Sequence, residues 1–384
     1  MRVFNCDHCG HLVFFDSVQC LHCGNTLAFV PDQLTMATLA PAPQDGAGLW
    51  RRMAERGGSA PTGKLYRMCS NRAAYGACNF AVPATDYSPL CLSCRQTRVL
   101  PDLSEPTNLG RWQQVESAKR QLFYTLARLG LEPVPGRAGP VFEFLADWPG
   151  GPQVLTGHQG GTITLNVAEA DDDERARRRI ALGEPYRTLI GHLRHESGHF
   201  YWDQLVQGGA RLEEFRRVFG DERADYAAAL QAHYAKGGDV GPWAERHVSA
   251  YASAHPWEDW AETWAHYLHM VDTLDTALSF GLQCGEVEIQ IEPYGGDALD
   301  APGDPGAPSF LGLVNAWLQI TALMNELARS MGQPDLYPFV LSHHAVALDS
   351  RSLVQPEPSF SFELGGHFGL KTIQVAHHRQ RFVR

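Results

Sequence analysis

The spacing of apolar residues along this 384-residue chain predicts that helices dominate its C-terminal two-thirds. The clearest pattern runs from Arg111 to Leu129, where apolar side chains recur every three or four residues and would form one face of a helix. Pro185 suits the first turn of a later helix. Similar patterns predict helices at 185–206, 211–219, 223–234, 242–254 and 257–274, with at least two more before residue 347.

Strand patterns are fewer and shorter. An apolar segment, VFEFLAD, begins at Val141, and apolar side chains alternate within 157–167 after a glycine-rich turn. A third strand is expected at 286–294. Residues 40–47, APAPQDGA, are rich in Pro, Ala and Gly and are interpreted as a linker. The mixture predicts an α+β fold in which a mostly helical part carries a small sheet.

Composition and charge narrow the class of protein. The net charge of −11 argues against a protein that coats nucleic acid or anionic membrane through general electrostatics. The longest uncharged apolar stretch, 309–325, is interrupted by Asn315, Gln319 and Asn325 and is interpreted as a core helix, so no membrane partner is expected. The N-terminal segment has no basic region followed by a long apolar run, so no secretory signal is expected. These features predict a cytoplasmic location, where clustered cysteines indicate metal binding in preference to disulfides.

Eight of the nine cysteines precede residue 95 and form two clusters. The first cluster contains Cys6, Cys9, Cys20 and Cys23, and the second contains Cys69, Cys78, Cys91 and Cys94. The first has two C-x-x-C knuckles, each of which places two thiolates on one tight turn, as tetrahedral zinc requires. The second has one such knuckle and predicts a second structural zinc; free or redox-active cysteines are the alternative. Cys284 stands apart and is interpreted as a small buried residue.

Closed four-sulfur sites leave no open coordination position, so these two zinc ions would stabilise the fold of a small module without catalysing a reaction. Such a ribbon often presents a surface to a protein partner, and the alternative is that it only braces the rest of the chain. The first 30 residues hold one basic side chain, Arg2, against Asp7 and Asp16, so a nucleic-acid partner is not expected.

Residues 195–199 read HESGH, the pattern H-E-x-x-H. On a helix this spacing places the imidazoles of His195 and His199 one turn apart, so both can bind one zinc ion. The carboxylate of Glu196 points to the same region and can act as a base on water. Gly198 costs about 1 kcal/mol relative to Ala within a helix, which suggests a close approach by another element there.

A second helix, which includes the sequence HPWEDWAETWAHYLH, offers a third metal ligand. Glu258 and Glu262 lie four residues apart and share a helix face, so one can bind zinc while the other orients a ligand histidine. Asp203, four residues after His199, is a further alternative. Glu258 ranks first, Glu262 second and Asp203 third. Other side chains nearby are interpreted mainly as packing or surface residues; they are His192, His255, His266, Trp257, Trp260 and Trp264.

The two helices together resemble those of the gluzincin metallopeptidases, and their pattern is closest to the lethal-factor and Pro-Pro endopeptidase type. The resemblance rests on HESGH and on EDWAETW, residues 258–264. It implies that Glu258 binds the catalytic zinc. It also implies that Tyr251, seven residues earlier, stabilises the oxyanion. The aromatic residues of EDWAETW differ from the usual E-[FY]-F-A-E-x-F pattern of that type.

A wider resemblance covers most of the chain up to about residue 350. The chain is similar to a bacterial family of zinc-binding metallopeptidases with an N-terminal zinc ribbon, which implies a zinc peptidase but no particular substrate. The segments that carry this resemblance are CLSCRQTRVLPDL, NLGRWQQVESAKRQLFYTL, RTLIGHLRHESGHFYWD, HPWEDWAETWAHYL and RSMGQPDLYPFVL.

The sequence thus predicts three parts: a zinc-ribbon region with two zinc sites at 1–100, a zincin-like metallopeptidase domain at 101–350, and a C-terminal tail at 351–384. The predicted activity is hydrolysis of peptide bonds in a peptide or protein substrate by a zinc-activated water, with Glu196 as general base. The predicted cofactors are one catalytic and two structural zinc ions. The alternative is a non-catalytic interaction or regulatory protein that keeps the zincin fold and binds a protein partner through its ribbon.

Overall fold

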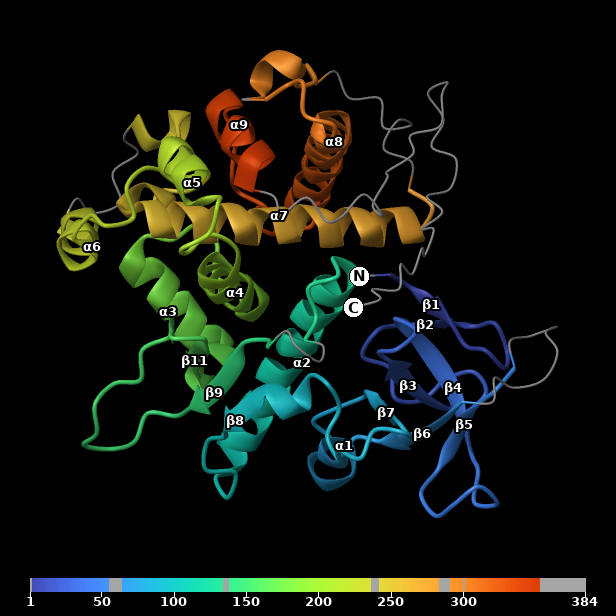
Figure 1. The fold of residues 1–384 in the computed structure, drawn as a ribbon. Helices are drawn as coiled ribbons and strands as arrows, with labels where there is room; N and C mark the ends of the chain where they lie inside the picture. Colours follow the sequence, from blue (N-terminus) through green and yellow to red (C-terminus); the bar gives the residue numbers. More distant parts are fainter. Residues whose placement is uncertain are drawn as a thin grey trace. The chain divides into compact units, whose positions relative to one another are not determined.

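A computed structural model describes residues 2–54, 64–133, 138–235, 242–282, 291–299 and 301–352, with side chains described as far as residue 347. The fold is α+β, as the sequence predicts (Figure 1). Two compact units are present: Met1–Ile180 with Arg187–Phe200, and Ala181–Tyr186 with Tyr201–Arg384. The three-part division by sequence stays a prediction. Cys284, most of the predicted strand 286–294 and almost all of the tail lie outside the described residues.

The first unit begins with short antiparallel strands. Strands β1 (Phe4–Asn5) and β2 (Leu12–Val13) form a hairpin. A five-stranded antiparallel sheet follows in the order β3-β4-β5-β6-β7. Its strands are β3 (Thr26–Val30), β4 (Thr35–Pro41), β5 (Trp50–Arg52), β6 (Leu65–Met68) and β7 (Ala81–Pro83), with helix α1 (Ser70–Tyr75) between the last two.

The interpretation of residues 40–47 as a linker is wrong. This stretch completes strand β4 and turns into β5, and the amide of Ala42 donates to the carbonyl of Leu49 across the turn, at 2.8 Å. Gly46 adopts a φ of 147° there, which a side chain would resist. Pro and Gly therefore mark a turn within one sheet here. The prediction failed because the same residue types are common in hairpin turns and in linkers.

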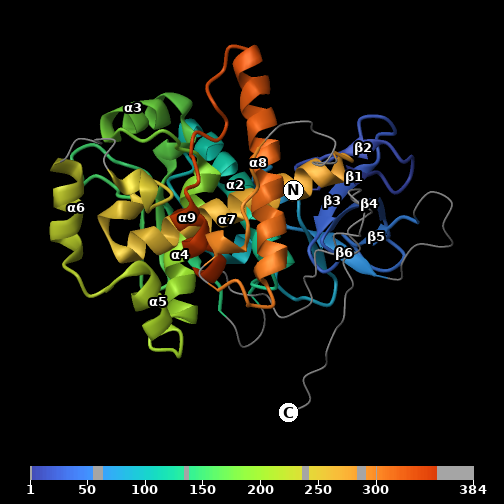
Figure 2. The ribbon, with the colours of Figure 1, turned by 90° about the horizontal axis from the view of Figure 1, so that it is seen from above.

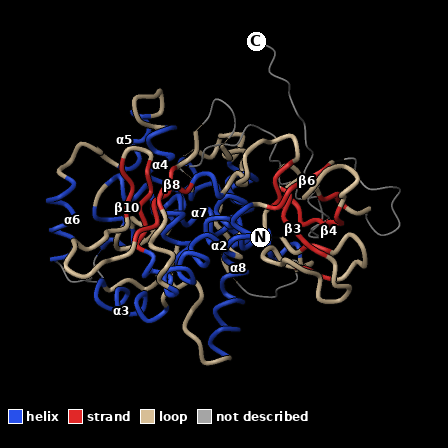
Figure 3. Tube along the Cα trace, turned by 90° about the horizontal axis from the view of Figure 1, so that it is seen from below, coloured by secondary structure: helices blue, strands red, loops and turns tan. Residues whose placement is uncertain are grey.

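Helix α2 (Pro106–Arg128) lies between this sheet and a second one, and it confirms the strongest predicted helix (Figure 3). On one side Phe123 and Tyr124 pack against Phe80 and other aromatic residues of the first sheet region. On the other side the ammonium of Lys119 lies 5.4 Å from the ring centre of Phe142 in the second sheet. Lys119 is fully buried and pairs with the equally buried Glu116, so α2 joins both sheets into one unit.

The second sheet has the strand order β10-β11-β9-β8. Its strands are β8 (Thr97–Val99), β9 (Val141–Leu145), β10 (Gly157–Gln159) and β11 (Thr162–Asn166). Strand β9 is parallel to both neighbours, whereas β10 and β11 form an antiparallel hairpin. The predicted strand at Val141 is confirmed, and the predicted strand 157–167 is a hairpin of two strands. Strand β10 is thus left at the edge of the sheet.

The charged run 169–179 forms a turn of 3₁₀ helix and then helix α3 (Asp172–Leu182). Its first acid, Glu169, is fully buried and accepts hydrogen bonds from Arg178 and Arg187, both at 2.7 Å. These two arginines tie α3 and the start of the next helix to the end of the sheet. The sequence favours either a solvated segment or the start of a helix for this run, and the structure confirms the start of a helix.

Helix α4 (Leu189–Leu205) carries the HESGH sequence and begins four residues later than predicted. The hydroxyl of Thr188 accepts the amide hydrogen of Gly191 at 3.0 Å, which caps the first turn. Pro185 therefore lies before the helix and not in its first turn. The cap at Thr188, which was not anticipated from the sequence, therefore sets the start of the helix.

The second unit is mostly helical (Figure 1). Its helices are α5 (Leu212–Phe219), α6 (Tyr226–Ala235), α7 (Pro256–Ser279), α8 (Ala307–Ser330) and α9 (His343–Ser352). The predicted helix 242–254 is wrong: two short 3₁₀ helices, Pro242–Glu245 and Ala252–Ala254, occupy its ends. The hydroxyl of Ser249 accepts the amide hydrogen of Ala252 at 3.0 Å, a local bond that competes with a continuous helix.

Helix α8 packs one face against α7 and α9, and Figure 2 shows it standing beside α9. Val314, Trp317 and Ile320 of α8 join Met270 and Leu274 of α7 in the apolar core of this unit. Within the described part of the chain, α8 alone is long and apolar enough to cross a membrane, and a third of its most apolar stretch is buried. A core helix of a soluble protein meets the same criterion, so this finding is weak evidence for a membrane span.

Candidate metal centres and active site

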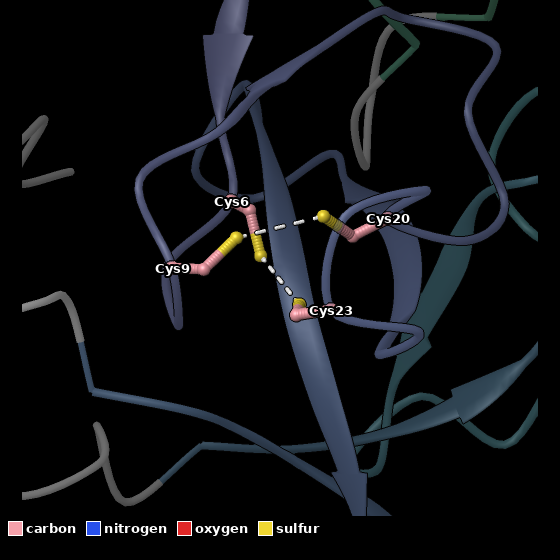
Figure 4. A group of neighbouring side chains, drawn as sticks. All are labelled: Cys6, Cys9, Cys20 and Cys23. Carbon is pink, nitrogen blue, oxygen red and sulfur yellow. Dashed lines mark hydrogen bonds between the residues drawn. The ribbon is translucent and has the colours of Figure 1, made fainter.

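The first cysteine cluster sits on two tight turns that face each other (Figure 4). Each turn is closed by a glycine amide that donates to a cysteine carbonyl: Gly10 to Cys6 and Gly24 to Cys20, both at 2.8 Å. The sulfur of Cys6 lies 3.7 Å from that of Cys23, and Cys9 lies 3.7 Å from Cys20. Sulfurs about 2.3 Å from one tetrahedral zinc lie about 3.8 Å apart, so this arrangement fits zinc and is too open for disulfides.

The first turn is anchored to the five-stranded sheet through Asp7. Its carboxylate accepts two hydrogen bonds from the buried guanidinium of Arg52, at 2.9 and 3.1 Å, and one from the amide of Thr38 at 2.8 Å. The Thr38 hydroxyl accepts the Asp7 amide hydrogen in return, at 2.9 Å. A residue inside the knuckle therefore holds the metal-binding turn against strand β4.

Replacing Asp7 with Ala is expected to destabilise the first unit by about 3–5 kcal/mol, because it leaves the buried Arg52 without its carboxylate partner. Denaturant unfolding followed by circular dichroism measures this loss. The matched control is Asp45→Ala, which removes a half-exposed ion pair to Arg51 (2.7 Å) and should cost about 0–1 kcal/mol. Equal unfolding midpoints for the two variants would contradict the anchoring role.

The second cysteine cluster is more deeply buried than the first. All four sulfurs lie within 4.8 Å of one another, and Cys78 and Cys91 are 3.7 Å apart. Backbone amides of Phe80, Cys91 and Cys94 donate to cysteine sulfurs at 3.3–3.4 Å, which favours thiolates over thiols. The cluster lies in the aromatic core that α2 helps to form. Both clusters thus have the geometry of closed structural zinc sites.

The two histidines of HESGH project from α4 toward a common point. Their Nε2 atoms are 3.2 Å apart and their rings are nearly perpendicular, at 83°. Two nitrogens about 2.0–2.1 Å from one tetrahedral zinc lie about 3.4 Å apart, so the pair fits chelation of a single ion. His199 is buried and His195 is half-buried.

Glu258 completes a group of three possible metal ligands. One carboxylate oxygen of Glu258 and one nitrogen each of His195 and His199 all lie within 4.8 Å of one another. Glu258 is 1% exposed and occupies the first turn of α7, where the positive end of the helix dipole stabilises a carboxylate. Neither Glu262 nor Asp203 belongs to this group. The geometry therefore favours Glu258, the first-ranked alternative, and its binding of zinc stays a prediction.

The C-terminal turn of α4 packs on α7 through aromatic residues. Tyr201 stacks on Trp264 with ring centres 5.0 Å apart, and Trp202 meets Trp257 edge to face at 6.3 Å. These contacts hold the last turn of α4 on α7 within the second unit. Trp260 and Trp264 are buried, as expected for core residues.

Two further predicted site residues have identified partners. The carboxylate of Glu262 accepts a hydrogen bond from Ser249 at 2.6 Å. Tyr251 lies just before the 3₁₀ helix Ala252–Ala254, and its ring contacts that of His233 at 5.7 Å. Oxyanion stabilisation by Tyr251 stays a prediction.

The histidines interpreted as ordinary residues have structural partners. His255 caps α7, because its Nδ1 accepts the amide hydrogen of Trp257 at 3.1 Å while its Nε2 faces the carbonyl of Ala224 at 3.1 Å. His266 is buried and bonded to the hydroxyl of Tyr337. His192 lies 3.8 Å from the buried Glu169.

Two side chains near the metal-ligand group were not anticipated from the sequence. The ring of His158, in strand β10, lies almost parallel to that of His199 with centres 6.3 Å apart, and its Nε2 accepts the amide hydrogen of Gly161 at 3.2 Å. Burial, and then the neighbouring His199, lower the pKa of His158 to about 4, so it is neutral at pH 7. The second is Tyr226, whose hydroxyl donates to Glu258. Both residues contact partners that are distant in the sequence, so no residue spacing could have indicated them.

Comparison with known proteins agrees with this geometry. A family model described as "Putative zinc-binding metallo-peptidase" matches residues 108–349, and a zinc-ribbon domain model matches residues 3–105. Two relatives are Uncharacterized protein Mb2598c of Mycobacterium bovis and Uncharacterized protein Rv2568c of Mycobacterium tuberculosis. Each is 37% identical over 347 residues, which cover 89% of this chain and 91% of the relative. No solved structure matches the chain.

Proposed function

The chain belongs to this zinc-binding metallopeptidase family, and from that premise we propose that it hydrolyses peptide bonds with His195, His199 and Glu258 as ligands of a catalytic zinc. The observation that carries the proposal is the convergence of two imidazole nitrogens and one carboxylate oxygen within 4.8 Å, with Glu196 on the same helix as the histidines. Three protein ligands leave a fourth position open for water or substrate, as in catalytic zinc sites.

Zinc held by these residues would act as a Lewis acid that lowers the pKa of water and polarises the scissile carbonyl. The carboxylate of Glu196 would accept a proton from the attacking water and pass it to the leaving amine. Glu196 is 8% exposed, so its carboxylate works in a largely desolvated setting, where charge interactions are strong. We assign oxyanion stabilisation to the hydroxyl of Tyr251.

The position of strand β10 favours binding of an extended substrate beside the proposed metal ligands. It is one of the two edge strands of its sheet, so one side of its backbone can pair with a peptide. His158 in its middle lies against the ring of His199, which puts this edge close to the proposed zinc. We therefore propose that a peptide or unfolded protein segment adds to β10 as a strand.

The two cysteine sites would hold structural zinc, giving three zinc ions per chain together with the catalytic one. Exposed apolar side chains on the ribbon, such as Phe14 and Leu21, support a protein partner there. The eight clustered cysteines form no disulfide and have metal-binding geometry, which fits a reducing compartment, and we propose a cytoplasmic location. The alternative function is a non-catalytic zincin-fold protein that uses only this ribbon surface.

Metal analysis of Glu258→Ala beside Glu262→Ala tests the proposed ligand set. Glu258→Ala is expected to lose one zinc per chain and to keep the two cysteine-bound ions, because Glu258 is the acid that lies with His195 and His199 among the residues that the structure describes. Glu262→Ala, its matched control one helical turn away, should keep all three. Inductively coupled plasma mass spectrometry gives the counts, and hydrolysis of a peptide library should disappear with the third zinc. Loss of that zinc in Glu262→Ala alone would show that Glu262, and not Glu258, is the third zinc ligand.

A further inference from the structure

Helix α6 is a surface element that reaches a buried metal ligand. None of its described residues is buried, whereas Glu258 is 1% exposed. The two are joined by Tyr226, the first residue of α6, whose hydroxyl donates a hydrogen bond to Oε1 of Glu258. This contact spans 32 residues of sequence.

The ring of Tyr226 rests against the first turn of α7. Its centre lies 5.3 Å from that of His255 at 81°, and 5.9 Å from that of Trp257 at 75°. His255 is the residue that caps α7, and Glu258 is three residues further on. The two edge-to-face contacts therefore hold the Tyr226 ring beside the turn that presents the carboxylate.

A ligand carboxylate must hold one orientation, because each of its oxygens can face the metal in several rotamers. A hydrogen bond to one oxygen restrains the plane of the group and leaves the other oxygen for the metal. On this basis we propose that Tyr226 is a positioning residue that orients Glu258 for metal binding, an inference that rests on the function proposed above. Packing alone does not require the hydroxyl, since phenylalanine would make the same ring contacts with His255 and Trp257.

The phenol hydrogen bond also withdraws electron density from the carboxylate. Loss of this hydrogen bond should change both the metal affinity and the ligand field of the site. The fold of α6 should not change, because the Tyr226 ring would be replaced by a phenylalanine ring in the same place. Removal of a side chain that supports a metal ligand in this way typically lowers metal affinity by about 10–100-fold.

The test is the variant Tyr226→Phe, with Tyr234→Phe on the same helix as control. Competition with a zinc chelator measures the affinity of the third zinc, and Tyr226→Phe is expected to bind it about 10–100-fold more weakly. Tyr234→Phe should match the wild type. The two cysteine-bound zinc ions should remain in both variants and report that the chain is folded.

Cobalt(II) provides the second readout. With zinc kept in the cysteine sites and cobalt in the third, the visible absorption of Tyr226→Phe should differ from that of the wild type and of Tyr234→Phe. If the wild type takes up three metal ions and Tyr226→Phe equals it in affinity and spectrum, the positioning role is overturned while the proposed site stands. If the wild type takes up only two, the proposed catalytic site fails and this inference fails with it.

Discussion

Replacing Glu196 with Gln is expected to slow peptide hydrolysis by about 10²–10⁴-fold while the third zinc remains bound. The reason is that Glu196 lies between His195 and His199 on α4 but is absent from the group of metal ligands. Glutamine has nearly the same shape and cannot accept the proton of the attacking water. Proton transfer should therefore be lost without loss of metal. Initial rates on a cleaved peptide, measured beside zinc content, give both quantities.

The matched control is Asp203→Asn, which makes the same chemical change seven residues further along α4. Asp203 also lies outside the ligand group, so this variant should keep both its zinc and its activity within a few-fold of wild type. Equal rates for Glu196→Gln and wild type would contradict the peptidase proposal. Together with three bound zinc ions, that result would favour the non-catalytic interaction protein.

The parts of the site that could be predicted from the sequence are those set by local geometry. The four-residue spacing of His195 and His199 follows from the pitch of a helix, and each C-x-x-C knuckle follows from one tight turn. The proposed third ligand lies on a second helix. The sequence narrowed the candidates to three acids, and only the packing of side chains favours Glu258 among them.

The features that could not be predicted depend on contacts between distant segments or on competing local signals. The periodicity of the sequence could not indicate Tyr226 or His158, because their partners, Glu258 and His199, lie more than 30 residues away in the sequence. Competing local signals explain the other differences. At the start of α4, Pro185 lies before the helix and the first turn is capped by Thr188. At 242–254 the hydroxyl of Ser249 makes a local hydrogen bond that competes with a continuous helix.

The first turn of α7 concentrates several of these long-range contacts. His255 caps it, Glu258 carries the carboxylate proposed as a zinc ligand, and the hydroxyl of Tyr226, on another helix, donates a hydrogen bond to that carboxylate. The same turn contains Trp257, which packs against Trp202 of α4. A change in any of these side chains should therefore alter metal binding through the orientation of Glu258, the one among them that would bind the ion.

The second large effect is expected from Cys91→Ser, which should lose one zinc per chain and the cooperative unfolding of the first unit. Cys91 is 1% exposed and lies in the core with Phe80 and Phe123. A structural zinc contributes about 10–16 kcal/mol of apparent binding free energy, which is comparable to the total stability of a domain, about 5–15 kcal/mol. Thermal unfolding by circular dichroism and zinc analysis measure the two losses.

The matched control is Cys284→Ser, which removes the one cysteine outside both clusters in the sequence and should retain three zinc ions. The result also separates the two roles proposed for zinc. Cys91→Ser removes an ion that holds the fold, so activity should fall along with the unfolding transition. Glu258→Ala removes an ion that serves catalysis, so activity should fall while the unfolding transition of the first unit keeps its wild-type midpoint. Three bound zinc ions and a wild-type midpoint in Cys91→Ser would mean that the second cluster does not bind zinc, however closely its sulfurs converge.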